Sequence, residues 1–383
     1  MIVYAPLFIV AALAMLFSGM IGNRKITEML GFVIILGLVI VSGTRYHLGG
    51  YDYQNYVYMF KQAPSLAQFN LIDYIKLNGL IGNDIGWTLL NSLIKSLGMG
   101  FYGLTMFVAL FFWLSMFFGL KKFFANINVL IVIVFYKYFL DMSFVYMRQS
   151  IAVALFIIAL PALRDRKIIR YMILVILAAS VHFSAIILIP LYWIGNIKLS
   201  KKKVISYSII FTFSFVASLM HIDVMSIFSS FANLIGGTGG TKISEAAAGN
   251  LYGGNATNIL HLLEFWVLNL FLLLKYETID LGDKSNALII RLFLILLPIY
   301  SLFAGSPIMV RDGFYFLFTY AILLDLLTKN VTIKNRLVTY MVIATISFYG
   351  MYRFATNFDN GASYHYDSFL MHKENLKTNV NVE

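Results

Sequence analysis

The chain has 383 residues, of which 60% are hydrophobic and 12% are charged, and its lack of cysteine excludes disulfides, thiolate metal sites and cysteine nucleophiles. The hydrophobic residues form long blocks, which excludes a water-soluble globular protein and indicates a polytopic membrane protein. A net charge of +11 would suggest a nucleic-acid partner in a soluble protein, but basic cytoplasmic loops explain it here, so no nucleic acid is expected.

Apolar segments follow one another along almost the whole chain. The first has no basic residue ahead of it and no cleavage site after it, so it is expected to be a membrane helix rather than a signal peptide. The runs lie near 1–20, 29–43, 101–120, 129–147, 149–163, 168–182, 184–195, 204–220, 258–274, 287–304, 314–328 and 337–352. We therefore expect an all-α fold over 1–383, a single integral membrane domain with about 12 (11–12) transmembrane helices, some of them short.

Basic residues gather at alternate junctions between these runs. They are Arg24 and Lys25; Lys121 and Lys122; Arg164, Arg166, Lys167 and Arg170; Lys198 and Lys201 to Lys203; Lys275 and Lys284; and Lys329, Lys334 and Arg336. The positive-inside rule places them in the cytoplasm. The loops 44–100 and 221–257 and the tail 353–383 are then external, together with both chain ends. This requires an even number of crossings, which a turn at "SVHFSAI" provides by dividing 168–195 into a hairpin of two short helices.

The external face keeps arginines that the same rule disfavours. Arg148 and Arg311 each lie at the outer mouth of a helix with apolar residues on both sides, and Arg45 and Arg353 lie on the same face. Taken singly, each could anchor a helix end at lipid headgroups. Together they indicate an anion site, since guanidinium groups suit bidentate contacts with phosphate. Further polar residues predicted on this face include Asp73, Asp84, Gln149, Asp312, Tyr364 and His365.

The external segment "SGTRYHLGGYDYQNYVYMF" adds aromatic and acidic groups. Tyr51, Tyr53 and Tyr56 offer flat rings with a hydroxyl at the tip, which suit sugar rings, and Asp52 can accept hydrogen bonds from sugar hydroxyls. The alternative is an ordinary interfacial aromatic belt. That alternative does not explain the interleaved Arg45 and Asp52.

Other polar residues lie within the apolar runs. His182 is either a hydrogen-bonded core residue or, at an outward turn, a group that titrates near neutral pH. Lys137 and Asp141 are four residues apart, which predicts an ion pair within one helix. His261 and Glu264 are expected to be structural, and no metal-ligand constellation is recognisable on the external face.

Four motifs in order resemble the EpsG family of bacterial polysaccharide polymerases, which is allied to the Wzy-type O-antigen polymerases. They are "RYHLGGYDYQNYVYMF", "YMRQSIAVALFIIAL", "SVHFSAIILIPLYWI" and "VRDGFYF", and they span Arg45 to about Phe316. In this chain two residues separate Gly49 from Asp52 where many members have one. This departure leaves the register of the aspartate open.

The resemblance implies a glycosyltransferase of the bacterial inner (cytoplasmic) membrane. No cofactor is expected, and the external arginines, without a recognisable metal constellation, predict metal-independent transfer. The enzyme would move a growing glycan from undecaprenyl pyrophosphate onto the next lipid-linked repeat unit at the periplasmic or exterior face, with membrane lipids and a chain-length regulator protein as further partners. Arg148 and Arg311, with Arg45 as a further candidate, would stabilise the departing pyrophosphate, and Asp52 or His182 would act as the base. Substrate-binding groups would be Arg45, Tyr51, Tyr53, Tyr56, Gln149 and Arg353.

Three other functions are alternatives. A lipid-linked oligosaccharide flippase would show charges throughout a central cavity and internal two-fold symmetry, neither of which is visible in the sequence. A membrane acyltransferase would place its histidine chemistry towards a cytoplasmic acyl donor. An O-antigen ligase uses the same donor with similar arginine chemistry, and the sequence distinguishes it from a polymerase only through the family motifs.

Overall fold

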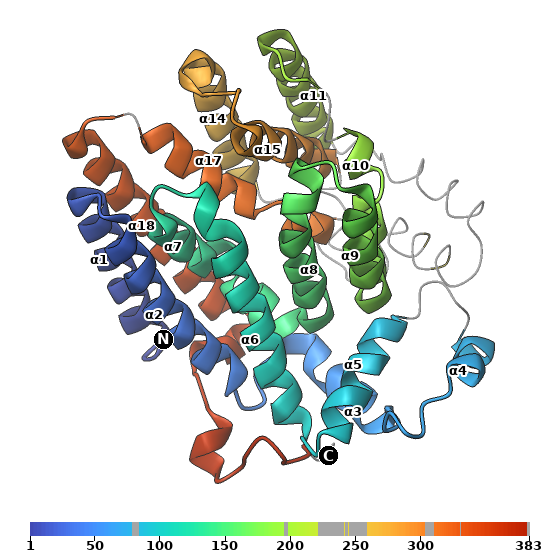
Figure 1. Cartoon of the computed structure of the whole chain (residues 1–383). Helices are drawn as coiled ribbons and strands as arrows, with labels where there is room; N and C mark the ends of the chain where they lie inside the picture. Colours follow the sequence, from blue (N-terminus) through green and yellow to red (C-terminus); the bar gives the residue numbers. More distant parts are fainter. Residues whose placement is uncertain are drawn as a thin grey trace.

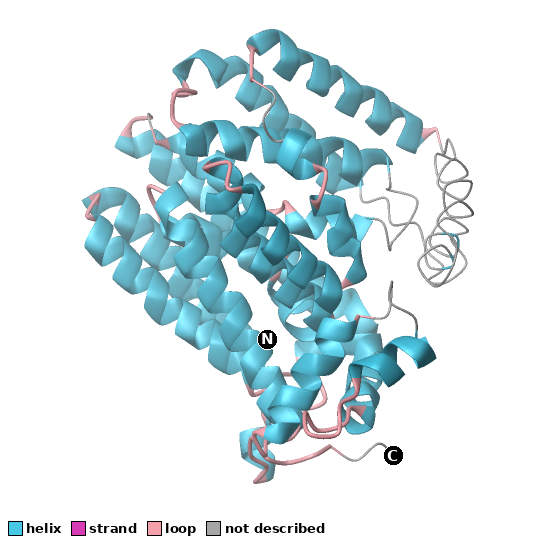
Figure 2. Cartoon of the chain, turned by 45° about the vertical axis from the view of Figure 1, so that its right-hand side comes forward, coloured by secondary structure: helices cyan, strands magenta, loops and turns pink. Residues whose placement is uncertain are grey.

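The structure, a computed structural model, describes residues 1–78, 84–194, 198–220, 241, 244, 259–302, 310–329 and 331–380. Across these ranges the regular structure is helical and no strand forms, as Figure 2 shows. One isolated bridge joins Arg45 to Ser368. The prediction of an all-α protein is therefore confirmed for the described part of the chain.

Most of the α-helices lie in the predicted apolar runs. In chain order they are α1 (Tyr4–Ile21), α2 (Arg24–Gly43), α3 (Tyr53–Gln62), α4 (Leu71–Asn78), α5 (Ile85–Ser96), α6 (Phe101–Leu120), α7 (Ile127–Lys137), α8 (Met147–Arg164), α9 (Ile168–Val181), α10 (Leu191–Ile194), α11 (Lys201–Leu219), α14 (Ile259–Lys275), α15 (Lys284–Leu302), α17 (Phe318–Thr328) and α18 (Ile333–Asn357). However, α3, α4 and α5 lie in the predicted loop 44–100, and within the predicted run 129–147 the helix α7 ends at Lys137. Among the described helices, α1, α2, α6, α8 and α15 are long and apolar enough to cross a membrane, and shorter apolar helices accompany them. These helices make the chain a membrane protein, while the total of about 12 spans stays a prediction.

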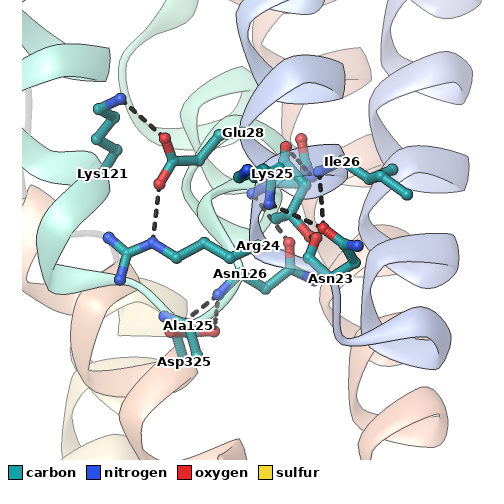
Figure 3. Close-up of polar contacts among 11 residues, drawn as sticks. Asn23, Arg24, Lys25, Ile26, Glu28, Lys121, Ala125, Asn126 and Asp325 are labelled. Carbon is teal, nitrogen blue, oxygen red and sulfur yellow. Dashed lines mark hydrogen bonds and ion pairs between the residues drawn. The ribbon is translucent and has the colours of Figure 1, made fainter.

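The turn between α1 and α2 shows how the sequence ends one helix and starts the next. Gly22 follows α1 with a φ of 65°, a left-handed conformation that glycine adopts without strain, and its amide bonds to the Ser18 carbonyl. The Asn23 side chain then accepts hydrogen bonds from the amides of Lys25 and Ile26, at 3.0 and 3.2 Å. Figure 3 shows this cap.

The predicted basic junctions lie together at one end of the bundle. Glu28 accepts from Arg24 and from Lys121, each at 2.8 Å, which ties the start of α2 to the end of α6 (Figure 3). Lys122 in turn lies within electrostatic range of Arg164 at the end of α8. The Arg164 guanidinium reaches the hydroxyl of Ser285 at the start of α15 at 3.4 Å. Junctions far apart in the sequence therefore share one face.

The opposite end of the bundle carries both chain ends and the loop after α2. The amino group of Met1 bonds to the carbonyl of Tyr364, beyond the last helix. Phe369 donates its amide to the Thr44 carbonyl at 2.9 Å, and Tyr46 donates to the Asp367 carbonyl at 3.0 Å. Figure 1 shows the two termini and α3 to α5 at this end. We call it the polar end; that it faces outward is the prediction from the positive-inside rule.

The stretch 168–195 reverses direction at His182, as the hairpin prediction requires. The helix α9 ends at Val181, and a 3-10 helix, η4 (Phe183–Leu188), leads back towards α10. Arg166 donates to the Tyr192 carbonyl at 2.7 Å, and the Tyr192 hydroxyl donates to the Arg166 carbonyl at 2.8 Å. The start of α9 and the end of the returning segment are thus adjacent, and His182 lies at the far tip.

Candidate functional site

Arg148 forms an ion pair at the polar end. It is the second residue of α8 and lies beside the loop that leads into α5. Its Nη1 is 2.5 Å from Oδ2 of Asp84, and the two side chains are 24% and 7% exposed. This contact uses Nη1, and a guanidinium carries five N–H donors in all, so it can also donate to a further acceptor.

The remaining surroundings of Arg148 are aromatic and partly unsatisfied. Its Cζ lies 5.7 Å from the ring centroid of Tyr56, a cation–π distance. Its Nε is buried and has no hydrogen-bond partner in the described part of the chain. A buried hydrogen-bond donor without a partner lowers stability, so an anion that accepts a hydrogen bond from Nε would remove this cost.

Arg311 approaches the same end of α8 from another segment. It begins the 3-10 helix η6 (Arg311–Tyr315), and its Cζ lies 4.4 Å from the ring centroid of Tyr146, directly before α8. The Gln149 side chain donates to the Arg311 carbonyl at 2.7 Å. The structure therefore brings Arg148, Gln149 and Arg311 together around the start of α8.

Asp52 lies near this group. It ends a short 3-10 helix, η1 (Gly50–Asp52), in which Gly50 has a φ of 60°, and its side chain is half-buried. Its carboxylate lies within electrostatic range of Arg148, Tyr56 and Tyr146. A carboxylate is thus present near Arg148.

The turn at His182 contacts Asp84, the partner of Arg148. His182 has an extended backbone, with φ −146° and ψ 112°, and the next amide, that of Phe183, donates to Oδ1 of Asp84 at 3.0 Å. Asp84 therefore contacts both Arg148 and the turn that carries His182. The sequence placed Asp84 on this face but gave no reason to connect it with either residue.

A third carboxyl group, that of Asp312, lies next to Arg311 in the chain. It is 9% exposed, and burial raises the pKa of its carboxyl to about 7, although a hydrogen bond from Ser184 works in the opposite direction. Ser184 also lies 3.1 Å from the hydroxyl of Tyr315. Sequence reasoning noted Asp312 as external but gave no role to this cluster, because nothing in the sequence predicts its depth.

The arrangement combines two arginines, three carboxyl groups and the turn at His182 at one end of a helical membrane bundle. The EpsG family model matches residues 28–369, which is most of the chain. The chain belongs to the EpsG family. This membership indicates a glycosyltransferase-like polymerase of polysaccharide biosynthesis. No curated protein and no solved structure matches the chain significantly.

Arg45 of this EpsG-family chain has a different position from the one expected. Its side chain is 0% exposed, and it donates to the carbonyls of Ser42 at 2.5 Å, Leu48 at 2.8 Å and Phe144 at 3.3 Å. Burial lowers the pKa of Arg45 to about 10, which leaves it charged at neutral pH. These contacts fit a side chain that fixes the loop after α2, and they do not fit the predicted contact with substrate.

The predicted sugar-binding tyrosines are also mostly in the core. Tyr53 and Tyr56 are 4% and 3% exposed, so neither offers an open ring face to a sugar. The side chain of Tyr51 lies outside the described residues, as do all residues of the predicted external loop 221–257 except 241 and 244. Arg353 is exposed on α18 and lies within electrostatic range of Tyr136, so it belongs to a different group of residues.

That other group corrects the predicted pairing of Lys137. Lys137 Nζ lies 2.8 Å from Glu264 on α14, so the predicted pair with Asp141 in the same helix is wrong. Glu264 also accepts from the hydroxyls of Tyr136, at 3.2 Å, and Tyr320. The tertiary partner prevails because a buried ammonium needs a carboxylate with good geometry, and Glu264 offers it between packed helices. These contacts join α14 to neighbouring helices, which fits the structural role predicted for Glu264.

Proposed function

We propose that the protein is a surface-polysaccharide polymerase of the bacterial inner membrane. It transfers a growing glycan from its undecaprenyl-pyrophosphate carrier onto the next lipid-linked repeat unit, at the outer face. The observation that carries this proposal is the convergence of Arg148 and Arg311 on the start of α8, with a buried Arg148 Nε that lacks a described partner. Two cations at the membrane surface match a lipid-linked pyrophosphate in charge and in position.

The chemistry needs stabilisation of the leaving group above all. The bond between the anomeric carbon and the pyrophosphate oxygen breaks, and negative charge develops on that oxygen. Cations that are already oriented lower the energy of this state without reorganising during the reaction. Arg148 is oriented by Asp84, and Arg311 by its packing on Tyr146. We assign these two side chains to the pyrophosphate, without a metal ion in that role.

The acceptor hydroxyl of the next repeat unit forms the new bond to the anomeric carbon and loses its proton. Asp52 is the first candidate to receive this proton, because it is half-buried within electrostatic range of Arg148. His182 is the second candidate, since the hairpin tip is fixed to Asp84 through the Phe183 amide. The carrier pyrophosphate then departs with both electrons of the broken bond.

The proposed roles of the other predicted residues follow their surroundings. Gln149 positions Arg311 through the hydrogen bond from its side chain to the Arg311 carbonyl at 2.7 Å. Tyr56 packs against Arg148. A chain-length regulator protein stays an expected partner of a polymerase of this kind.

Deletion and complementation in the source strain tests the proposal. The length distribution of the surface polysaccharide would be resolved on a gel. A deletion strain that carries single repeat units, with long chains restored by the gene, supports a polymerase. Loss of all surface transfer would contradict it and indicate a ligase or a flippase.

A further inference from the structure

We infer that Asp84 is a positioning residue that fixes the Arg148 guanidinium and holds the His182 turn beside it. The inference rests on the proposed function and adds a residue that none of the sequence motifs contains. It concerns one carboxylate with two different partners. Each of its oxygens is used by one of them.

The contacts divide cleanly between the two oxygens. Oδ2 lies 2.5 Å from Arg148 Nη1, and Oδ1 accepts from the Phe183 amide at 3.0 Å. A charge-assisted hydrogen bond of this length restricts the plane of the guanidinium. Because the same carboxylate also holds the residue after His182, the arginine and the histidine turn have a common anchor.

The backbone around Asp84 is arranged to deliver this carboxylate. Asp84 has φ and ψ of 47°, a left-handed conformation that aspartate tolerates better than most residues. Two residues later, Gly86 packs so closely on Ser180 and Val181 that a Cβ atom there would collide with them. The start of α5 is therefore docked on the last turn of α9. This docking fixes Asp84 relative to the hairpin tip.

The charge of Asp84 gives its role a kinetic signature. A carboxylate that is 7% exposed beside Arg148 repels an incoming pyrophosphate while it orients the arginine. Its removal should therefore leave ground-state binding of the anion unchanged or stronger. The chemical step should slow, because Arg148 would no longer be held where charge develops. A residue that only maintained the fold would not strengthen anion binding.

The test compares Asp84→Asn with Asp73→Asn in purified, membrane-reconstituted protein. Asparagine can still accept from the Phe183 amide, so the hairpin contact survives while the charge is lost. Asp73 is an exposed aspartate in the same external segment and serves as the matched control. For Asp84→Asn we expect kcat to fall about tenfold or more, a KM for the lipid-linked donor that does not rise, and inhibition by inorganic pyrophosphate that is as strong or stronger. Asp73→Asn should behave as wild type.

A double-mutant cycle with Arg148→Lys shows whether Asp84 acts through the arginine. If it does, the loss in kcat/KM of the double variant will be clearly smaller than the product of the two single losses. A kcat for Asp84→Asn within twofold of the wild type would overturn the inference. Weaker inhibition by pyrophosphate together with multiplicative losses would also overturn it.

Failure of the proposed function looks different from failure of this inference. If wild-type protein does not elongate a lipid-linked repeat unit, the proposed function is contradicted and the role of Asp84 falls with it. If wild type elongates and Asp84→Asn elongates equally well, the proposed function stands and Asp84 has no positioning role.

Discussion

The guanidinium of Arg148 lies 2.5 Å from the carboxylate of Asp84, although 64 residues separate them in the chain. Arg148 is the second residue of the buried helix α8, whereas Asp84 directly precedes α5 in the segment predicted to be external. Their contact joins that segment to the membrane bundle, and the His182 turn is attached to the same carboxylate. The site is therefore assembled from three parts of the chain that meet at the polar end.

Replacement of the two arginines should stop polymer formation. Arg148→Ala and Arg311→Ala should each lower the rate of elongation about 100-fold or more, because each removes a cation from the developing oxyanion. Lysine should restore little, since it offers a point charge in place of a planar fork. Polysaccharide length on a gel, normalised to protein in the membrane, measures this. Arg170→Lys, at an exposed position among the basic junctions, is the control. Full activity of Arg148→Lys would contradict the anion site and indicate that Arg148 only anchors a helix end at lipid headgroups.

Arg45 should behave as a residue of the fold rather than of the site. Arg45→Ala leaves three carbonyl acceptors without their donor in a buried place and should lower the free energy of unfolding by about 3 kcal/mol or more. Thermal unfolding of the detergent-purified protein measures this. Arg353→Ala, at an exposed position, should change neither stability nor activity. An unchanged melting temperature for Arg45→Ala with lost activity would restore the predicted contact with substrate.

Asp312 should make stability depend on pH. Burial raises the pKa of its carboxyl from 3.8 to about 7, so the folded state favours the protonated form. The contribution of protonated Asp312 to the free energy of unfolding is present in full below about pH 4. It is lost as pH rises from 4 through 7. Asp312→Asn should therefore gain in melting temperature relative to wild type at pH 8 and differ little at pH 4. Parallel curves for the two proteins between these values would contradict this account.

Several features were readable from the sequence because they depend on local or bulk properties. Apolar runs predicted most of the long helices. The alternation of basic junctions required an even number of crossings and hence a turn inside 168–195, which the structure places at His182. Charges at a helix mouth are costly, which made Arg148 and Arg311 candidates, and the structure places both near the start of α8. These inferences use membrane physics that acts on every residue of a given type.

The remaining features depend on distant partners. Lys137 has Asp141 four residues away, yet it pairs with Glu264 on another helix. Arg45 looked available for substrate but is enclosed by carbonyls, one of them at Phe144, 99 residues away. Asp84 differs from Asp73 only in what surrounds it. Sequence spacing carries no information on such contacts, because tertiary packing decides them.

The two ends of the bundle should lie on opposite sides of the membrane. The chain has no cysteine, so single cysteines can be introduced cleanly. Ala67→Cys and Asn379→Cys, both exposed at the polar end, should react with an impermeant maleimide in intact cells. Ser200→Cys, exposed at the basic end, should react only after the cells are opened. The reverse pattern would place the site in the cytoplasm and contradict the outward assignment.

The central claim is transfer from a lipid pyrophosphate by a protein site built on arginines, and reconstitution tests it most directly. Purified protein would receive a synthetic lipid-pyrophosphate repeat unit, excess chelator and no nucleotide sugar, and products would be resolved by length. The account predicts a ladder of elongated lipid-linked glycan in the presence of chelator, absent for Arg148→Ala. A reaction that stops with chelator and resumes with magnesium or manganese, or one that requires a nucleotide sugar, would contradict it.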